Sequence, residues 1–120
     1  MLPAGSGGAA PARGEVWLLD LNPTRGREQA GTRPALVLSV DGFNQGPADL
    51  IVVLPITSKA KGIPFHVLVE PPEGGLRVTS FVKCEDIRSV SRERFLQRYG
   101  VVSAETLAAV ADRVRILLDL

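Results

Sequence analysis

The sequence predicts a mainly β fold that ends in one long helix. Three apolar segments of at most seven residues, 15–21, 35–40 and 50–56, are bounded by Gly, Pro or Asn, which is typical of buried strands. From residue 103 onward, apolar residues recur at helical spacing instead. Because no internal repeat divides the chain, these patterns favour a single compact, largely antiparallel β-barrel or strongly bent sheet that carries a terminal helix.

The first twelve residues have the composition of a disordered leader ahead of a single domain at 13–120. Gly, Ala and Pro dominate residues 1–12, and such residues bury too little apolar surface to offset the entropy of ordering. This stretch lacks the basic start and apolar run of a secretory signal. No apolar run approaches the ~18 residues of a membrane helix. We therefore expect a soluble, cytoplasmic protein with no membrane association.

The third apolar segment contains a proline near its end. Pro55 has no backbone N–H to donate to a sheet ladder, so it is expected at an edge, a bulge or a strand end. Thr57 would then emerge where strand pairing is interrupted. From the residues alone, a Thr at this position is better explained as a strand cap than as part of a functional site.

Two further strands are predicted at 64–70 and 80–85, separated by the turn sequence "PPEGG". In 64–70, apolar residues that include Phe65 alternate with a set that includes His66, which predicts a half-buried strand. His66 is the only histidine, and a structural or edge role is expected for it.

The strand predicted at 80–85 presents a charged pair on one face. Lys83 and Glu85 are placed on the same side, about 7 Å apart along the strand, and make a candidate surface site. Cys84 points to the opposite side with Val82. We expect Cys84 to be a small buried apolar residue rather than a nucleophile, because no neighbouring residue is identified as its base.

The C-terminal part is predicted as a strand within 96–102, preceded by a helical turn around 91–95 and followed by an amphipathic helix. Ser103 is the predicted N-cap, with Glu105 in the first turn. The apolar positions at helical spacing are Leu107, Val110, Val114, Leu117 and Leu118.

Composition excludes several classes of site. The chain has 14 Lys and Arg against 13 Asp and Glu, so any site for a polyanion must be local. One Cys and one His cannot make an intrachain disulfide or a zinc site of the usual N/S kind. We therefore expect no zinc site of this kind, and we also expect no other metal and no cofactor.

A long polar connection, "NPTRGREQAGTRP" at 22–34, joins the first two strands. Connections of this length are uncommon in compact domains and tend to be functional or disordered. Its arginines match phosphate oxygens, while a solvated loop that only confers solubility is an equal alternative. Arg33 differs from the others because Pro34 biases it to an extended conformation at the start of a buried strand. The Arg33 side chain would therefore project from a rigid backbone.

The run "RGEVWLLDLNPTRGREQAGTRPALVLS", residues 13–39, closely resembles the opening signature of the MazF/PemK family of toxin endoribonucleases. The resemblance continues through "VVLPITS", "PFHV", "VKCEDIR" and the terminal helix. It implies an SH3-like barrel with helices, as in MazF/PemK and CcdB-like toxins, and a homodimer. It also implies metal-independent, sequence-specific cleavage of single-stranded RNA through 2′-hydroxyl attack, leaving 2′,3′-cyclic phosphate and 5′-hydroxyl ends. The implied partner is a MazE-like antitoxin with an acidic, disordered tail.

The resemblance places the catalytic centre at Arg33, Thr57 and Glu28. Arg33 would bind the scissile phosphate and Thr57 would donate to a non-bridging oxygen. Because arginine stays protonated, we prefer Glu28 as the proton acceptor, although Glu28 could instead pair with a loop arginine. The predicted RNA-binding residues are Arg25, Arg27, Ser58, Lys59, Phe65, Lys83 and Glu85, of which Lys83 and Glu85 replace Arg and Asp of some relatives.

Two alternatives share the implied fold. A CcdB-like gyrase-binding toxin would be expected to carry a Trp near the end of its terminal helix, whereas the only Trp here is Trp17, which we expect in the core or a dimer interface. A catalytically silent module that binds RNA or antitoxin is disfavoured by the retention of Arg33, Thr57 and Glu28 together.

Overall fold

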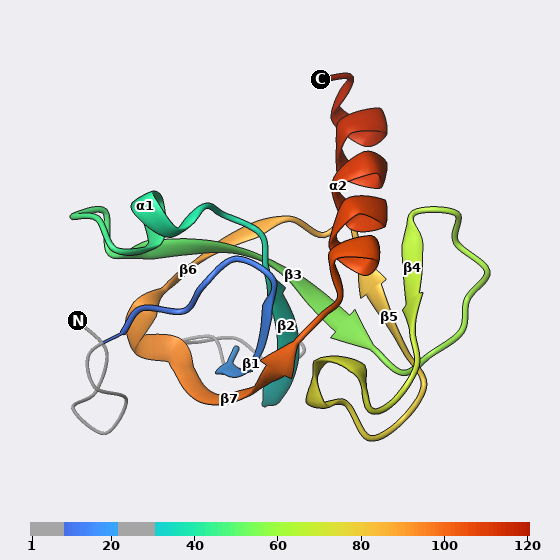
Figure 1. Ribbon diagram of the computed structural model, residues 1–120, viewed down its shortest axis with the longest axis horizontal. Helices are drawn as coiled ribbons and strands as arrows, with labels where there is room; N and C mark the ends of the chain where they lie inside the picture. The colour runs from blue at the N-terminus through green and yellow to red at the C-terminus, as the bar shows by residue number, and fades with distance from the viewer. Residues whose placement is uncertain (1–8, 22–30) are drawn as a thin grey trace.

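The computed structural model describes residues 9–21 and 31–120, and it confirms the mainly antiparallel fold with a C-terminal helix (Figure 1). Among the described residues, seven strands form one sheet in the order β4-β5-β3-β2-β1-β7, with β6 pairing β3 off this path. The elements are β1 Glu15–Asp20, β2 Thr32–Val37, α1 Asp41–Asn44, β3 Leu50–Thr57, β4 His66–Val69, η2 Glu73–Gly75, β5 Ser80–Lys83, β6 Arg88–Ser91, η3 Arg92–Arg94, β7 Phe95–Val101 and α2 Ala104–Leu118.

β3 is the central strand, and its pairing changes at the proline. One edge pairs with β2 in a register that includes Ala35 opposite Pro55. The other edge pairs with β6 up to Val53 and with β5 from Ile56 onward. Pro55 falls between these two ladders, where its missing N–H costs no hydrogen bond. Pro55 therefore lies inside a central strand rather than at a sheet edge or strand end, and only its pairing on one edge is interrupted. Thr57 is paired again, opposite Phe81 of β5.

Apolar side chains pack on both faces of the sheet, in two clusters. Along β1, β2 and β3 they alternate between the faces, as the pleat requires. The first cluster lies against α2 and includes Val16, Leu36, Leu54, Ile56, Val82, Cys84, Val110 and Val114. The second lies on the other face and includes Trp17, Leu19, Ala35, Val37, Ile51, Val53, Val90 and Phe95.

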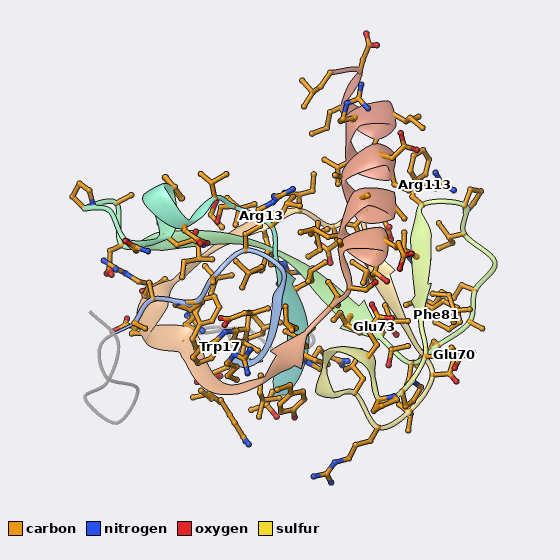
Figure 2. The ribbon with its side chains drawn as sticks, in the orientation of Figure 1. Arg13, Trp17, Glu70, Glu73, Phe81 and Arg113 are labelled. Carbon is orange, nitrogen blue, oxygen red and sulfur yellow. The ribbon has the colours of Figure 1, made fainter. Side chains whose placement is uncertain are left out.

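Trp17 belongs to the second cluster, inside the curve that β1 and β7 describe (Figure 2). Trp17 is 8% exposed, and its ring meets the Phe95 ring edge-on, with ring centroids 5.8 Å apart. The indole N–H donates to Oε1 of Glu15 at 2.9 Å, which satisfies its one polar atom. The prediction of a core position is therefore confirmed.

The terminal helix begins where the sequence predicts. Ser103 is the N-cap, and its Oγ accepts from the backbone N–H of Thr106 at 3.1 Å. Val110 and Val114 are buried against the first cluster. Leu117 and Leu118, which share the predicted apolar spacing, are 37% and 49% exposed because the helix extends past the sheet (Figure 1).

Several boundaries differ from the predicted ones. β2 starts at residue 32 and ends at 37, and β6 and α1 were not predicted. β6 has the sequence RSVS, in which the one apolar residue, Val90, gives no readable alternation. β5 ends at Lys83, so Cys84 and Glu85 form a turn and the predicted shared strand face of Lys83 and Glu85 is wrong.

The described part of the predicted leader contacts the domain. Pro11 is fully buried, and its carbonyl accepts from the buried Asn44 side chain at 3.0 Å. The Ala12 N–H donates to Glu15 Oε1 at 2.8 Å. Residues 1–8 lie outside the described residues. These contacts make residues 11 and 12 part of the folded unit.

Candidate functional site

Two cavities meet at the ends of β2 and β3. The first has a volume of about 530 Å³ and the second about 460 Å³. The first cavity is lined by Thr32, Arg33, Pro34, Ile56, Thr57, Ser58, Lys59, Gly75, Leu76, Arg77, Val78, Ser80, Gln97, Arg98 and Tyr99. The second is lined by Leu21, Arg33, Pro55, Ile56, Thr57, Lys59, Lys61, Lys83, Asp86 and Arg88. Their shared walls are Arg33, Ile56, Thr57 and Lys59.

Strand register brings Arg33 and Thr57 together. The β2 and β3 partners run antiparallel, with Val37 opposite Val53 and Ala35 opposite Pro55. Continuing that register by two residues places Arg33 across from Thr57. Cross-strand partners project to the same face with Cβ atoms about 5 Å apart. The two predicted catalytic residues therefore border the same space.

Arg33 is mounted on a paired strand. Its backbone lies opposite Leu19 of β1, and the next residue, Pro34, lies opposite Leu18. Arg33 itself is partly buried. Because β1 supports the backbone of β2 on one edge, the guanidinium extends from a fixed backbone, as predicted for a residue that precedes Pro34 at the start of a buried strand.

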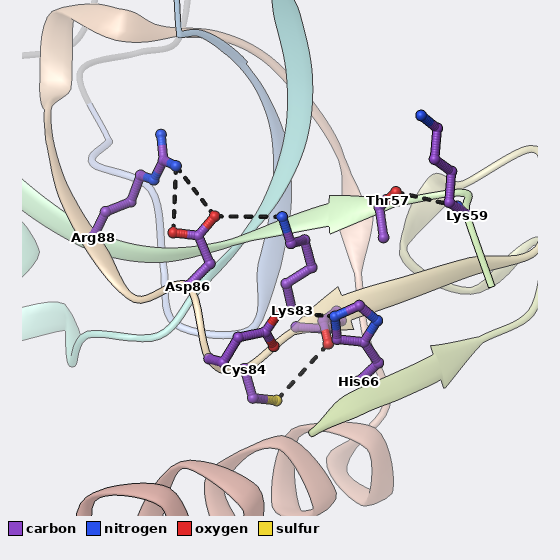
Figure 3. Close-up of polar contacts among 9 residues, drawn as sticks. Thr57, Lys59, His66, Lys83, Cys84, Asp86 and Arg88 are labelled. Carbon is purple, nitrogen blue, oxygen red and sulfur yellow. Dashed lines mark hydrogen bonds and ion pairs between the residues drawn. The ribbon is translucent and has the colours of Figure 1, made fainter. Parts of the chain in front are cut away.

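Thr57 ends β3, and its hydroxyl is held from one side. The backbone N–H of Lys59 donates to Thr57 Oγ1 at 3.1 Å (Figure 3). A hydroxyl that accepts one hydrogen bond keeps its own hydrogen to donate. Thr57 can therefore donate toward an anion in either cavity while its orientation is maintained by the turn that follows.

Three predicted site residues, Arg25, Arg27 and Glu28, lie outside the described residues. The two ends of their connection are described. The Leu21 N–H donates to the Gly31 carbonyl at 3.1 Å, and Leu21 lines the second cavity. The predicted loop therefore leaves and re-enters the sheet beside this cavity.

The other predicted RNA-binding residues divide into two groups. Ser58 lines the first cavity, Lys83 the second and Lys59 both. Phe65 and Glu85 line neither cavity. Phe65, in the turn just before β4, is partly buried against the first core cluster.

Glu85 contacts the only histidine instead of the cavity. His66 Nε2 lies 2.9 Å from Glu85 Oε2, and the His66 side chain is only 3% exposed. Its Nδ1 atom is buried and has no hydrogen-bond partner among the described residues. His66 is thus a buried side chain of β4 that contacts the turn after β5, and it lines neither cavity.

Cys84 is expected to resist thiol reagents in the folded protein. The side chain is fully buried, and burial, reinforced by the negative charge of Glu85, raises the pKa of its thiol to about 11. Since the thiolate is the reactive form, a disulfide reagent such as DTNB at about pH 8 should label the native protein slowly and the denatured protein fully.

Alkaline pH should weaken this protection. The folded pKa of Cys84 lies above the ordinary value of 9.0, so the stability that its protonation contributes is present below pH 9.0 and is lost as pH rises through about 11. At about pH 8, labelling of the native protein as fast as the denatured protein would contradict the burial of Cys84.

Several polar residues of the cavities were not predicted as site residues from the sequence. Arg77 and Tyr99 line the first cavity, and Asp86 and Arg88 line the second. Asp86 and Arg88 stand within "VKCEDIR", which the resemblance already included. Their spacing gave no signal because Arg88 begins a strand that the pattern of apolar residues does not reveal.

Residues 9–21 and 31–120 lack two features that would point to other functions. No helix in this part of the chain is long and apolar enough to cross a membrane. Within the same ranges, no group of three or more His, Cys, Asp or Glu side chains is arranged to hold a metal ion.

Comparison of the sequence with known proteins gives one family. A model described as PemK-like, MazF-like toxin of type II toxin-antitoxin system matches residues 12–118. The chain is 42% identical over 113 residues to endoribonuclease MazF9 of Mycobacterium tuberculosis, covering 90% of this chain and 96% of that relative. It is 41% identical over 81 residues to endoribonuclease PemK of Escherichia coli, covering 65% of this chain and 59% of PemK.

Comparison of the structure gives the same result. A crystal structure of MazF from Deinococcus radiodurans superposes with a TM-score of 0.78 at 36% identity, covering 92% of this chain and 98% of that one. A MazE-MazF structure from the same organism gives a TM-score of 0.79 at 34% identity, with coverage of 92% and 97%.

Proposed function

Because the chain belongs to the family of PemK-like and MazF-like toxins of type II toxin-antitoxin systems, we propose that it is an endoribonuclease that cleaves single-stranded RNA at Arg33 and Thr57. The observation that carries this proposal is that Arg33 and Thr57 both line each of the two cavities, an arrangement that the register of β2 and β3 favours. Because the two cavities share Arg33, Ile56, Thr57 and Lys59, a polymer that spans both would pass these two side chains.

The proposed reaction is a transesterification within the RNA. The 2′-oxygen forms a bond to phosphorus while the bond from phosphorus to the 5′-oxygen breaks, which gives a 2′,3′-cyclic phosphate and a 5′-hydroxyl. One proton leaves the 2′-hydroxyl and one is given to the 5′-oxygen. Negative charge grows on the non-bridging oxygens, where the guanidinium of Arg33 and the hydroxyl of Thr57 can each donate.

The reaction class is tested with the purified protein and a long single-stranded RNA in EDTA. We expect discrete fragments with 2′,3′-cyclic phosphate and 5′-hydroxyl ends, identified by mass spectrometry. Intact RNA, or fragments that form only when a divalent metal is restored, would refute metal-independent cleavage. End sequencing of the same fragments gives the recognition sequence.

Glu28 is proposed as the group that accepts the 2′-hydroxyl proton. A carboxylate is a competent base, whereas a guanidinium stays protonated. Glu28→Gln should slow single-turnover cleavage and flatten the acid limb of the pH-rate profile. Glu93→Gln, an exposed carboxylate of η3 that lines neither cavity, is the matched control. An unchanged acid limb in Glu28→Gln would assign the proton to another group.

The proposed assembly is a homodimer that an antitoxin inhibits. Solved MazE-MazF complexes are structural neighbours of this chain. We propose a MazE-like antitoxin whose acidic segment competes with RNA for the cationic cavity walls. The gyrase-binding alternative is disfavoured because it expects a Trp near the end of the terminal helix. Trp17 is buried in the second core cluster and does not lie on α2.

A further inference from the structure

The second cavity concentrates positive charge. Among the described residues that line it, five are basic and one is acidic, so these side chains carry a formal net charge of +4. The whole chain carries only +1. Such a local excess attracts a polyanion although the protein as a whole is nearly neutral. The five basic residues are Arg33, Lys59, Lys61, Lys83 and Arg88.

The one carboxylate of this lining, Asp86, holds two of the cations in place (Figure 3). Arg88 Nη2 lies 3.1 Å from Asp86 Oδ2 and 3.3 Å from Oδ1. Lys83 Nζ lies 3.6 Å from Asp86 Oδ2. The Asp86 backbone N–H donates to the Lys83 carbonyl at 3.1 Å, which fixes the turn. Asp86 therefore positions Lys83 and Arg88 at the cavity wall.

Arg88 lies on the same face of the sheet as the proposed catalytic pair. It is the Cα partner of Val53 across the β3–β6 ladder. Thr57 is four residues further along β3, so it projects to the same face as Val53, about 13 Å away along the strand. Arg88 and Arg33 consequently border one cavity from two different neighbours of β3.

We propose that Arg88 and Lys83, positioned by Asp86, form a second phosphate site that binds the RNA backbone beside the scissile phosphate. This inference rests on the proposed function. RNA carries a phosphate at every nucleotide, so a strand held at Arg33 must place further phosphates near it. Arg88 offers a planar fork and Lys83 a point charge, and a phosphate would take over contacts now made to Asp86.

The same cations could in principle attract carboxylates of an acidic protein segment. RNA is favoured because the second cavity is continuous with Arg33 and Thr57 through shared walls. Its apolar lining is also small, limited among the described residues to Leu21, Pro55 and Ile56. A peptide partner usually adds apolar anchors to its charges, whereas a nucleic acid backbone does not need them.

The test is the salt dependence of binding to a short random-sequence single-stranded RNA that is 2′-O-methylated throughout and so cannot be cut by 2′-hydroxyl attack. Each lost phosphate contact makes the slope of log K against log salt shallower by about 0.7 for a single strand. We expect this change for Arg88→Gln and for Lys83→Gln. Arg115→Gln is the matched control, because Arg115 is 63% exposed on α2 and lines neither cavity.

Each outcome decides the proposal separately from the proposed function. An unchanged slope in folded Arg88→Gln overturns the second phosphate site, even if the wild type cuts RNA. If Arg88→Gln weakens binding of a poly-glutamate peptide but leaves RNA binding unchanged, the second phosphate site is also overturned and the cations are assigned to a protein partner. If Arg88→Gln makes the slope shallower than that of the wild type, but the wild type cuts no RNA, the second phosphate site stands and the proposed nuclease activity is refuted.

A kinetic measurement separates this binding role from catalysis. If Arg88 only holds the backbone, Arg88→Gln should raise KM for a cleavable RNA while the single-turnover rate at saturation changes less than about threefold. A loss at saturation as large as that of an Arg33 variant would place Arg88 in the catalytic step and overturn its assignment as a binding residue.

Discussion

Replacing Arg33 with Ala should lower the single-turnover rate of RNA cleavage by about 10² to 10³-fold, the loss typical of one donor to the transition state. The reason is geometric. Arg33 extends from a strand that β1 supports and borders both cavities where they meet. Its guanidinium is in place before charge develops on the phosphate, so little reorganisation is needed at the moment of reaction. The measurement is the rate at saturating RNA.

Two further variants define what Arg33 contributes. Arg33→Lys keeps the positive charge but loses the planar fork, so it should recover only part of the rate. Thr57→Val removes a hydroxyl while it keeps the shape of the side chain, and it should also reduce the rate at saturation. Thermal melting and size-exclusion chromatography check that each variant is folded. A near-normal rate in folded Arg33→Ala would refute the assignment of the catalytic centre.

The sequence predicted Arg33 and Thr57 as site residues but could not predict their pairing. Pro55 was enough to place an interruption in strand pairing shortly before Thr57, because a missing N–H is a local property. The register that sets Arg33 opposite Thr57 depends on which strands become neighbours, and β3 changes its partner from β6 to β5 along its length. Such long-range choices are not encoded in the periodicity of one segment.

Arg88 shows why part of the candidate site escaped sequence analysis. β6 contributes one apolar residue, Val90, to the second core cluster. One apolar residue in four does not distinguish a strand from a loop. The prediction for Lys83 and Glu85 failed for a related reason, since β5 stops at Lys83 and the following turn directs Glu85 to His66. The side chain that reaches Lys83 in the cavity is Asp86.

The net charge of the whole chain, +1, also does not reveal the charge of the candidate site. The first cavity contains Arg98, but Arg98 is paired with Glu15 at 2.8 Å. Burial raises the pKa of Glu15, yet hydrogen bonds from Ala12, Trp17 and Arg98 and the charge of Arg98 outweigh it and leave that pKa lowered. Glu15 therefore stays ionised and offsets Arg98. The described lining of the first cavity still includes Arg33, Lys59 and Arg77 and no acidic residue, so both cavities are cationic.

Gly75→Ala should be among the most destabilising single substitutions in the chain. Gly75 ends η2 with a φ of +71°, and a Cβ built there would lie 2.1 Å from the Tyr99 carbonyl oxygen. The atom in the way belongs to the backbone of β7, so no side-chain rotation can relieve the clash. We expect a loss of about 3 kcal/mol or more, seen as a decrease in Tm of roughly 10 °C or more.

Gly62→Ala provides a control that isolates the clash. Gly62 has nearly the same backbone conformation, with a φ of +66°, but its Cβ would meet no atom within 4 Å among the described residues. This variant carries only the cost of a left-handed Ala, about 1–2 kcal/mol. Equal melting temperatures for the two variants would mean that η2 does not approach β7 so closely. Because Gly75 and Tyr99 both line the first cavity, that result would also remove one wall from the proposed RNA path.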